Sequence, residues 1–161
     1  MEIREATDAD CPGIWRFLRP IVDAGETYCY APDLAEPDAR VRWIVASPGT
    51  TVVAVEGGPV PGSATACPNQ GGGGTHVAGA SFMVDPDASG RAVGRALGLH
   101  ILEWARSAGL RSMQFNAVVE TNTSAVALWR SLGFEVLATV PEAFANPRAG
   151  LAGLSVMHRR L

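Results

Sequence analysis

The chain has 161 residues, 47% of them hydrophobic, with a formal net charge of −3 and a pI near 5.6. This length permits one domain with a sizeable core, and we expect residues 1–161 to form a single domain. The acidic balance argues against nucleic-acid binding. The chain contains no apolar run of about 18 residues, so we expect no membrane span. Cys11, Cys29 and Cys67 are spaced neither as a disulfide framework nor as a zinc site, so we expect reduced thiols, a cytoplasmic location and no metal.

The spacing of apolar residues predicts the elements in chain order, since alternation indicates strands and steps of three and four indicate helices. The predicted elements are a strand over 1–6, helices over 11–25 and 37–47, strands over 50–57, 58–68 and 77–86, a helix over 90–108, a strand over 110–119, a helix over 122–133, and strands over 134–141 and 151–160. This β-α-α-β-β-β-α-β-α-β-β order predicts an α+β or α/β fold with a partly antiparallel sheet.

Turn and cap residues set the expected boundaries. Pro20 is expected to kink or end the first helix, and the Gly57-Gly58 dipeptide is typical of a hairpin turn. Asn122 is expected to cap the N-terminus of its helix, and 142–150 is expected to be a loop. The helix over 37–47 is expected because Val41, Ile44 and Val45 lie at helical spacing.

The stretch SGRAVGRAL, Ser89–Leu97, begins the longest predicted helix and carries the clearest binding signal. It is neither a Walker loop, which needs Gly-Lys-Ser/Thr, nor G-x-G-x-x-G. A Gly-rich turn at a helix N-terminus nonetheless points several free backbone N–H groups at one anion, and a diphosphate fits such a cradle. Gly90 and Gly94 would let phosphate oxygens approach the main chain, with Arg91 and Arg95 adding charge at the rim. Alternatively, the two glycines only start a helix that packs closely.

Two segments together resemble the GCN5-related N-acetyltransferase (GNAT) family. VDPDASGRAVGRAL is similar to that family's acetyl-CoA turn, Gln/Arg-x-x-Gly-x-Gly/Ala, and NTSAVALWRSLGF is similar to its second signature. The resemblance covers nearly the whole chain. It implies the GNAT fold, an α+β fold in which helices in α/β/α layers flank a mixed, mostly antiparallel sheet whose fourth and fifth strands splay apart. It also implies an acyltransferase with acetyl-CoA as its donor.

The resemblance implies two sets of donor contacts. The turn would cradle the pyrophosphate, while main-chain groups of the fourth strand would pair with the pantetheine arm and polarise the thioester carbonyl. The acceptor amine would then attack the thioester directly. The residues concerned are Ser89, Gly90, Arg91, Ala92, Val93, Gly94 and Arg95 in the turn and Phe82, Met83 and Val84 in the strand.

Three positions depart from the family pattern. Ser89 stands where Gln or Arg is usual, and Ala92 stands where Gly is usual. We expect Ala92 to adopt right-handed helical geometry and to keep its N–H available. Trp129 stands where many members carry a tyrosine that protonates the leaving thiolate. An indole N–H is a donor only and cannot take that role, so Trp129 either packs in the core or lines the pantetheine channel.

Neutral amides mark the expected acceptor side. Asn116 lies within a predicted strand, where asparagine is disfavoured, and Asn122 and Asn69 end neighbouring segments on what we expect to be the same side. Each has a structural alternative, namely a hydrogen-bonded core amide, a helix cap and a turn residue respectively. No general base is assigned, although Glu120 and His76 lie near the expected site.

A narrower resemblance favours an acceptor related to amino acids. The segments PNQ…THVAGASFMV, QFNAVVETN and LATVPEAF are similar to a subgroup that contains fungal N-acetyltransferases acting on proline analogues such as azetidine-2-carboxylate. In that subgroup, amides surround the acceptor and an aromatic loop forms its wall. The residues implied as acceptor contacts are Asn69, Asn116, Asn122, Glu26, Tyr28 and Tyr30.

These patterns predict an acetyl-CoA-dependent N-acetyltransferase for a small amine, either an amino acid, an imino acid or a toxic analogue. Asn116 and Asn122 would orient the acceptor and favour its neutral form. Two alternatives stay open: a non-catalytic acyl-CoA-binding sensor, and an acetyltransferase for an antibiotic or a protein N-terminus. Homodimers are common in the resembled family, so a homodimer is a further expectation.

Overall fold

One seven-stranded sheet runs through the centre of the computed structural model, which describes residues 1–161. Helices and strands alternate along the chain much as the apolar spacing predicts. The elements are β1 (Glu2–Glu5), α1 (Cys11–Ala24), α2 (Glu36–Trp43), β2 (Thr50–Val55), β3 (Gly62–Pro68), β4 (Val77–Val84), α3 (Val93–Ser107), β5 (Ser112–Val119), α4 (Thr123–Ser131), β6 (Glu135–Asn146) and β7 (Gly150–Arg160).

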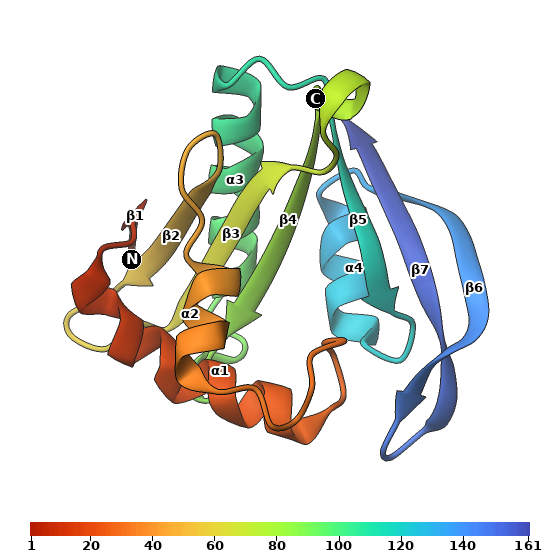
Figure 1. The fold of residues 1–161 in the computed structure, drawn as a ribbon, viewed down its shortest axis with the longest axis horizontal. Helices are drawn as coiled ribbons and strands as arrows, with labels where there is room; N and C mark the ends of the chain where they lie inside the picture. The colour runs from red at the N-terminus through yellow and green to blue at the C-terminus, as the bar shows by residue number, and fades with distance from the viewer.

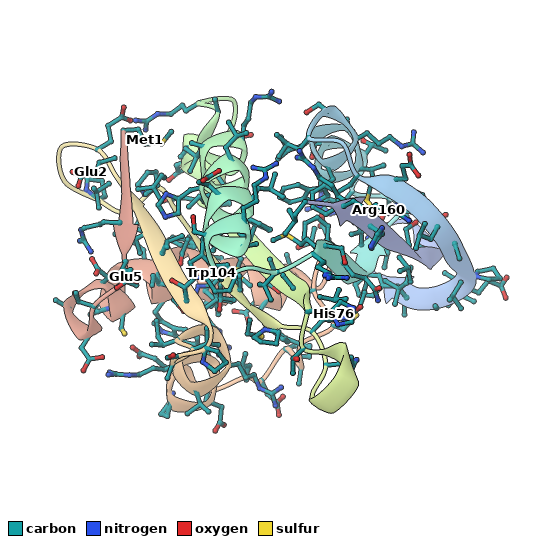
Figure 2. All side chains as sticks on the ribbon, turned by 90° about the horizontal axis from the view of Figure 1, so that it is seen from above. Met1, Glu2, Glu5, His76, Trp104 and Arg160 are labelled. Atoms are coloured by element: carbon teal, nitrogen blue, oxygen red, sulfur yellow. The ribbon has the colours of Figure 1, made fainter.

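The sheet is divided by a splay between its two central strands. Its order is β1-β2-β3-β4-β5-β7-β6, and every neighbouring pair is antiparallel except β4 and β5. These two parallel strands pair only where Val77 meets Ser112 and Ala78 meets Met113. Beyond these pairs the strands diverge (Figure 1), so the facing edges of β4 and β5 are left without strand partners. His76 and Arg160 lie at the closed end of this splay (Figure 2).

Helices cover both faces of the sheet. α1 and α2 lie over one face, and α3 and α4 lie over the other (Figure 1). Apolar residues at helical spacing face the sheet on each side, and they form one core around Phe17 and Trp43 and another around Leu97 and Ile101. The predicted α+β fold with α/β/α layers is therefore confirmed, as are the mostly antiparallel sheet and the splay of the fourth and fifth strands. None of the helices is both long and apolar enough to cross a membrane.

The second helix is shorter than predicted and buries a different face. It ends at Trp43, where the side-chain hydroxyl of Thr51 donates to the Trp43 carbonyl at 2.8 Å and accepts from the Val45 N–H at 3.0 Å. These bonds hold the following chain in an extended conformation. The helix buries Ala39 and Trp43, whereas Val41 is 78% exposed, so the apolar spacing of Val41, Ile44 and Val45 does not mark the buried face.

The first helix keeps its predicted length in spite of Pro20, whereas the sixth strand is longer than predicted. α1 continues through Pro20 to Ala24, because tertiary packing of its apolar face outweighs the one hydrogen bond that proline removes. β6 also continues through most of the stretch predicted as a loop, 142–150. An irregularity between Val140 and Phe144 interrupts its pairing with β7, and pairing then resumes. The local polar and proline residues indicated a loop, whereas the long partner strand supplies the hydrogen bonds.

Candidate functional site

A cleft of about 940 Å³ opens at the splay between β4 and β5. It is lined from both faces of the sheet, by the turn before α3 and the start of α4 on one side and by the loop between α1 and α2 on the other. All of the predicted site residues line this cleft except Glu26 and Arg91. Residues that are far apart in sequence are therefore brought together, as the donor and acceptor predictions require.

The turn before α3 presents a row of unused main-chain donors. The N–H groups of five residues make no hydrogen bond within the chain, and all five residues line the cleft. They are Gly90, Ala92, Val93, Gly94 and Arg95. Several N–H groups at a helix N-terminus attract an anion, because the partial positive charge of the helix end adds to the hydrogen bonds. The turn is therefore an anion cradle, which is the chemistry that a pyrophosphate needs.

Backbone conformation explains why the turn needs small residues. Gly90 has φ of +78° with open space around it, so it serves for its left-handed conformation. Ala92 has φ of 59° and ψ of 15°, so the prediction of right-handed geometry at this residue is wrong. α3 begins only at Val93, because the chain turns at Gly90 and at Ala92, both with positive φ, before it enters the helix. The Ala92 N–H is nonetheless free.

Gly94 has a packing reason as well as a binding one. A Cβ on this residue would lie 3.2 Å from Leu128 Cδ2, so the glycine lets α3 approach α4 closely. The alternative explanation from the sequence, close helix packing, thus applies to Gly94, while its free N–H still faces the cleft.

The charged and polar residues of the turn point in different directions. Arg91 pairs with the carboxylate of Glu56 and does not line the cleft. Arg95 lines the cleft and donates to Ser131 Oγ at 2.9 Å. The N–H of Ser89 is used within the turn, because it donates to the Pro86 carbonyl at 3.1 Å. Arg95 is therefore the arginine of this turn that can add charge at the rim.

The free edge of β4 is held by one tyrosine of the loop between α1 and α2. The Tyr28 hydroxyl accepts from the Phe82 N–H at 3.1 Å and donates to the Phe82 carbonyl at 2.5 Å. Main-chain groups of successive strand residues point to opposite edges, so Val84 shares this edge with Phe82 while those of Met83 point toward β3. Burial raises the pKa of Tyr28, so its hydroxyl keeps its proton at neutral pH.

Aromatic rings form the floor of the cleft on the side of α4. The Trp129 ring lies 4.6 Å from Phe82 and 4.9 Å from Phe115, measured between centroids, and Phe115 stacks on Phe134. Trp129 is only 7% exposed, so most of its ring packs in the core. It also lines the cleft, and its indole N–H has no partner in the protein. Core packing therefore describes most of this side chain, and its place at the cleft leaves the pantetheine-channel interpretation a prediction.

Two of the three predicted amides bind each other across the splay. Asn116 Nδ2 donates to Asn69 Oδ1 at 2.7 Å, and Asn69 Nδ2 donates back to Asn116 Oδ1 at 3.3 Å. Gln114 Nε2 joins them with a bond of 2.8 Å to Asn116 Oδ1. The register of β5 against β7 shifts between Phe115 and Val118, and such a bulge re-aims side chains. Asn116 is exposed to the cleft rather than buried in the core.

Asn122 caps α4, as its place in the sequence predicts. Its Oδ1 accepts from the Ala125 N–H at 3.2 Å and from Ser124 Oγ at 3.0 Å. Its Nδ2 makes no hydrogen bond in the protein, and the residue lines the cleft. The cap therefore uses the oxygen of this amide and leaves its nitrogen available to a ligand.

The cleft contains no acidic side chain and no histidine, and its two charged residues are Arg42 and Arg95. Glu120 is engaged elsewhere, because its carboxylate accepts from the Gly153 N–H at 2.6 Å. Glu26 pairs with Arg148 at 2.6 Å, outside the cleft lining. Nothing in the cleft can therefore act as a carboxylate or imidazole base.

Gln114 and Arg42 are among the lining residues that sequence reasoning missed. Gln114 precedes Asn116 by two residues in the strand. Side chains two residues apart lie on the same face of a strand, so this spacing could have predicted Gln114 as a lining residue. Arg42 lies on α2, among exposed charges, and its sequence context carries no signal that sets it apart.

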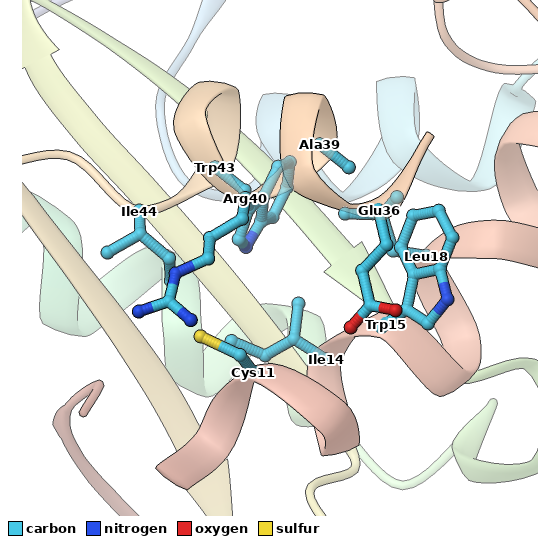
Figure 3. Close-up of a pocket in the computed structure, with 9 residues that line it drawn as sticks. All are labelled: Cys11, Ile14, Trp15, Leu18, Glu36, Ala39, Arg40, Trp43 and Ile44. Carbon is cyan, nitrogen blue, oxygen red and sulfur yellow. The ribbon is translucent and has the colours of Figure 1, made fainter. Parts of the chain in front are cut away.

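A second, smaller pocket lies between α1 and α2 (Figure 3). Trp15 and Trp43 help to line it, with Glu36 and Arg40 near its edge. Its volume of about 20 Å³ is the size of one water molecule, so it cannot hold a substrate. No group of three His, Cys, Asp or Glu side chains is placed to hold a metal ion.

Known proteins resemble this chain in sequence and in fold. A model described as "Acetyltransferase (GNAT) family" matches residues 15–134. A GCN5-related N-acetyltransferase from Kribbella flavida is 55% identical, with 99% of this chain and 97% of that chain covered and a TM-score of 0.97. The structure of yncA from Salmonella typhimurium with its cofactor acetyl-CoA is 25% identical, with 100% and 94% covered and a TM-score of 0.84.

A curated relative matches over a shorter region. N-acetyltransferase aca1 from Schizosaccharomyces pombe is 34% identical over 67 residues, which are 42% of this chain. The matched region is 32% of the fungal protein, so the similarity spans about a third of that relative's length.

Proposed function

Because this chain belongs to the acetyltransferase (GNAT) family, we propose that it transfers an acetyl group from acetyl-CoA to the amine of a small molecule. The family resemblance that the sequence predicts is thereby confirmed, and the predicted enzyme class, an acetyl-CoA-dependent N-acetyltransferase, is that of the family. The observation that carries the proposal is a single cleft that joins an anion cradle to an edge of β4 that has no strand partner. The acceptor we propose is an amino acid, an imino acid or a toxic analogue.

The donor side of the cleft fits the parts of acetyl-CoA. The free N–H groups of the turn would hold the pyrophosphate, and Arg95 would add charge beside it. The edge of β4 at Phe82 and Val84 would pair with the pantetheine arm. Acetyl-CoA supplies an acyl group activated as a thioester. The Phe82 N–H is placed to donate to a carbonyl oxygen at this edge, once the Tyr28 hydroxyl releases it. The yncA structure, which contains acetyl-CoA, supports the choice of donor.

The acceptor side fits a small neutral amine. Asn69 and Asn116 form a rigid amide pair, and the free Nδ2 of Asn122 can donate to an acceptor oxygen. These groups would orient the acceptor without adding charge, which favours the unprotonated amine that attacks the thioester. A polycation such as an aminoglycoside would prefer acidic walls, and this cleft has none. The match to a fungal N-acetyltransferase supports the narrower resemblance to fungal N-acetyltransferases that act on proline analogues.

One observation favours a second candidate function. The cleft has neither a carboxylate nor a histidine, and Trp129 cannot donate a proton to a leaving thiolate. A protein with this lining could bind acyl-CoA as a sensor and transfer nothing. In the enzyme, the proton that the amine loses would pass to water or to the leaving thiolate, since no carboxylate or imidazole lines the cleft.

The experiment that separates these functions measures CoA release from acetyl-CoA by chromatography, so that the three cysteine thiols do not interfere. The acceptor panel contains proline and its ring analogues, common amino acids, a polyamine and an aminoglycoside, with a reaction lacking acceptor as control. We expect turnover with an amino or imino acid. Turnover only with the polyamine or the aminoglycoside contradicts the proposed acceptor, and tight CoA binding with no turnover favours the sensor.

Three expectations stay predictions. They are a single acetyltransferase domain over residues 1–161, a cytoplasmic location and a homodimer. The three cysteines, free in the structure, are compatible with a reducing compartment.

A further inference from the structure

The two charged side chains of the cleft lie on opposite faces of the sheet. Arg95 lies on α3, next to the anion cradle, and donates to Ser131. Arg42 lies on α2, which covers the other face (Figure 1). The cleft therefore has one cation at each opening, and only the first belongs to the donor side.

The Arg42 guanidinium has no anionic partner in the protein. It takes part in none of the ion pairs, although arginines on the same helix and on the neighbouring one do: Arg40 pairs with Asp8, and Arg19 pairs with Asp23. It also donates no hydrogen bond to a side chain or carbonyl. An arginine carries five N–H donors in a fixed fork that matches a carboxylate, and all five of these donors are available at Arg42.

Two stacked aromatic rings link this guanidinium to the main-chain edge of β4. It lies over the Tyr30 ring, 5.9 Å from the centroid, and Tyr30 stacks on Tyr28 at 5.4 Å between centroids. The Tyr28 hydroxyl in turn contacts the Phe82 main chain. A cation over an aromatic face is held electrostatically, so Arg42 is positioned without being neutralised.

We propose that Arg42 binds the carboxylate of the acceptor and thereby selects amines that carry an acid group. This inference rests on the proposed function, since it names the residue that recognises the acceptor. The cleft has no carboxylate to compete for the guanidinium, and its uncharged polar side chains are amides, hydroxyls and thiols. An α-amino or imino acid would place its carboxylate on Arg42 and direct its nitrogen toward the edge of β4. The donor's phosphates have their own cradle on the opposite face.

The test compares each acid with its own carboxamide. The probes are L-proline, azetidine-2-carboxylate, L-alanine and L-methionine, each with the matching amide, assayed for acetylation and, separately, for binding to the CoA-loaded protein by calorimetry. Hydrogen bonds to a charged group favour the acid by about 10- to 100-fold in kcat/KM. Arg42→Gln should remove this preference, mainly by raising KM for the acid, and Arg42→Lys should restore part of it. Arg40→Gln is the matched control, because Arg40 lies on the same helix outside the cleft and its loss should leave the preference intact.

The possible outcomes distinguish a failure of the Arg42 subsite from a failure of the proposed N-acetyltransferase activity. Equal use of acids and amides by the wild-type protein overturns the role of Arg42 and leaves the N-acetyltransferase standing. An acid preference that survives Arg42→Gln also overturns it. If no amine of either kind is acetylated, the binding arm decides: acids that bind in an Arg42-dependent way support the subsite although the proposed function fails. If no acid binds, the subsite is overturned as well. Unchanged CoA binding by Arg42→Gln shows that the variant is folded.

Discussion

Ala92 holds a backbone conformation that an alanine adopts only at a cost. Its φ of 59° and ψ of 15° lie in the left-handed region, which costs an L-residue about 1–2 kcal/mol because of its Cβ. Glycine avoids that cost, but it loses about 0.4–1 kcal/mol through the greater entropy of the unfolded chain. Ala92 is exposed, so no packing is lost with its methyl group. We therefore expect Ala92→Gly to raise the free energy of unfolding by about 0.5–1 kcal/mol.

Urea unfolding followed by tryptophan fluorescence measures this difference, and a chain of this size should gain about 2 °C in its thermal midpoint. Ala127→Gly is the matched control, since Ala127 is also exposed but lies inside α4 in right-handed geometry. There the same substitution should cost about 1 kcal/mol. If Ala92→Gly lowers stability as the control does, the residue is not strained and the reasoning is refuted.

Three further predictions concern packing, acid stability and the amide that caps α4. Gly98→Ala would place a methyl group 2.8 Å from Leu132 Cδ1, an overpacking cost of about 1–3 kcal/mol against about 1 kcal/mol gained from helix propensity, so urea unfolding should show a net loss of about 1 kcal/mol; a gain in stability would contradict this close approach. The hydrogen bonds from Arg4 hold the pKa of the buried Asp10 well below its usual value of about 3.9. Its stabilising effect is therefore present above about pH 4 and is lost as the pH falls toward the lower folded pKa, so the deficit of Asp10→Asn at pH 7 should shrink at pH 3. Asn122→Ala should lower kcat/KM by about 100-fold and cost about 1 kcal/mol through the lost cap. Asn122→Asp keeps the capping oxygen, so it should lose activity without losing stability, and wild-type rates in that variant would remove Asn122 from the site.

Local signals in the sequence were sufficient for turns and caps. The Gly57-Gly58 turn and the cap at Asn122 are where the sequence predicts them, because their chemistry is set by one or two residues. The splay of β4 and β5 came from the family resemblance. Apolar spacing could not show it, since both strands look alike whether or not they pair along their whole length.

The features that sequence reasoning missed depend on distant parts of the chain. The end of α2 is fixed by the hydroxyl of Thr51, and the length of β6 is fixed by its partner strand. The left-handed turn at Ala92 follows from how the chain must enter α3. Arg42 reaches the cleft only because the helix that carries it lies beside the aromatic loop of Tyr30. The sequence next to each of these residues carries no signal of such long-range contacts.

The two sides of the cleft differ in how readily mutation can change them. Phe82 and Val84 offer main-chain groups at the splay, and every residue except proline carries both an N–H and a carbonyl. Arg42 and Asn116 would act through side chains, each of which a single substitution can replace. Successive substitutions can therefore change the side of the cleft formed by side chains, while the path of the backbone preserves the side formed by main-chain groups. Among relatives with this backbone, we expect the choice of acceptor to diverge long before the choice of donor.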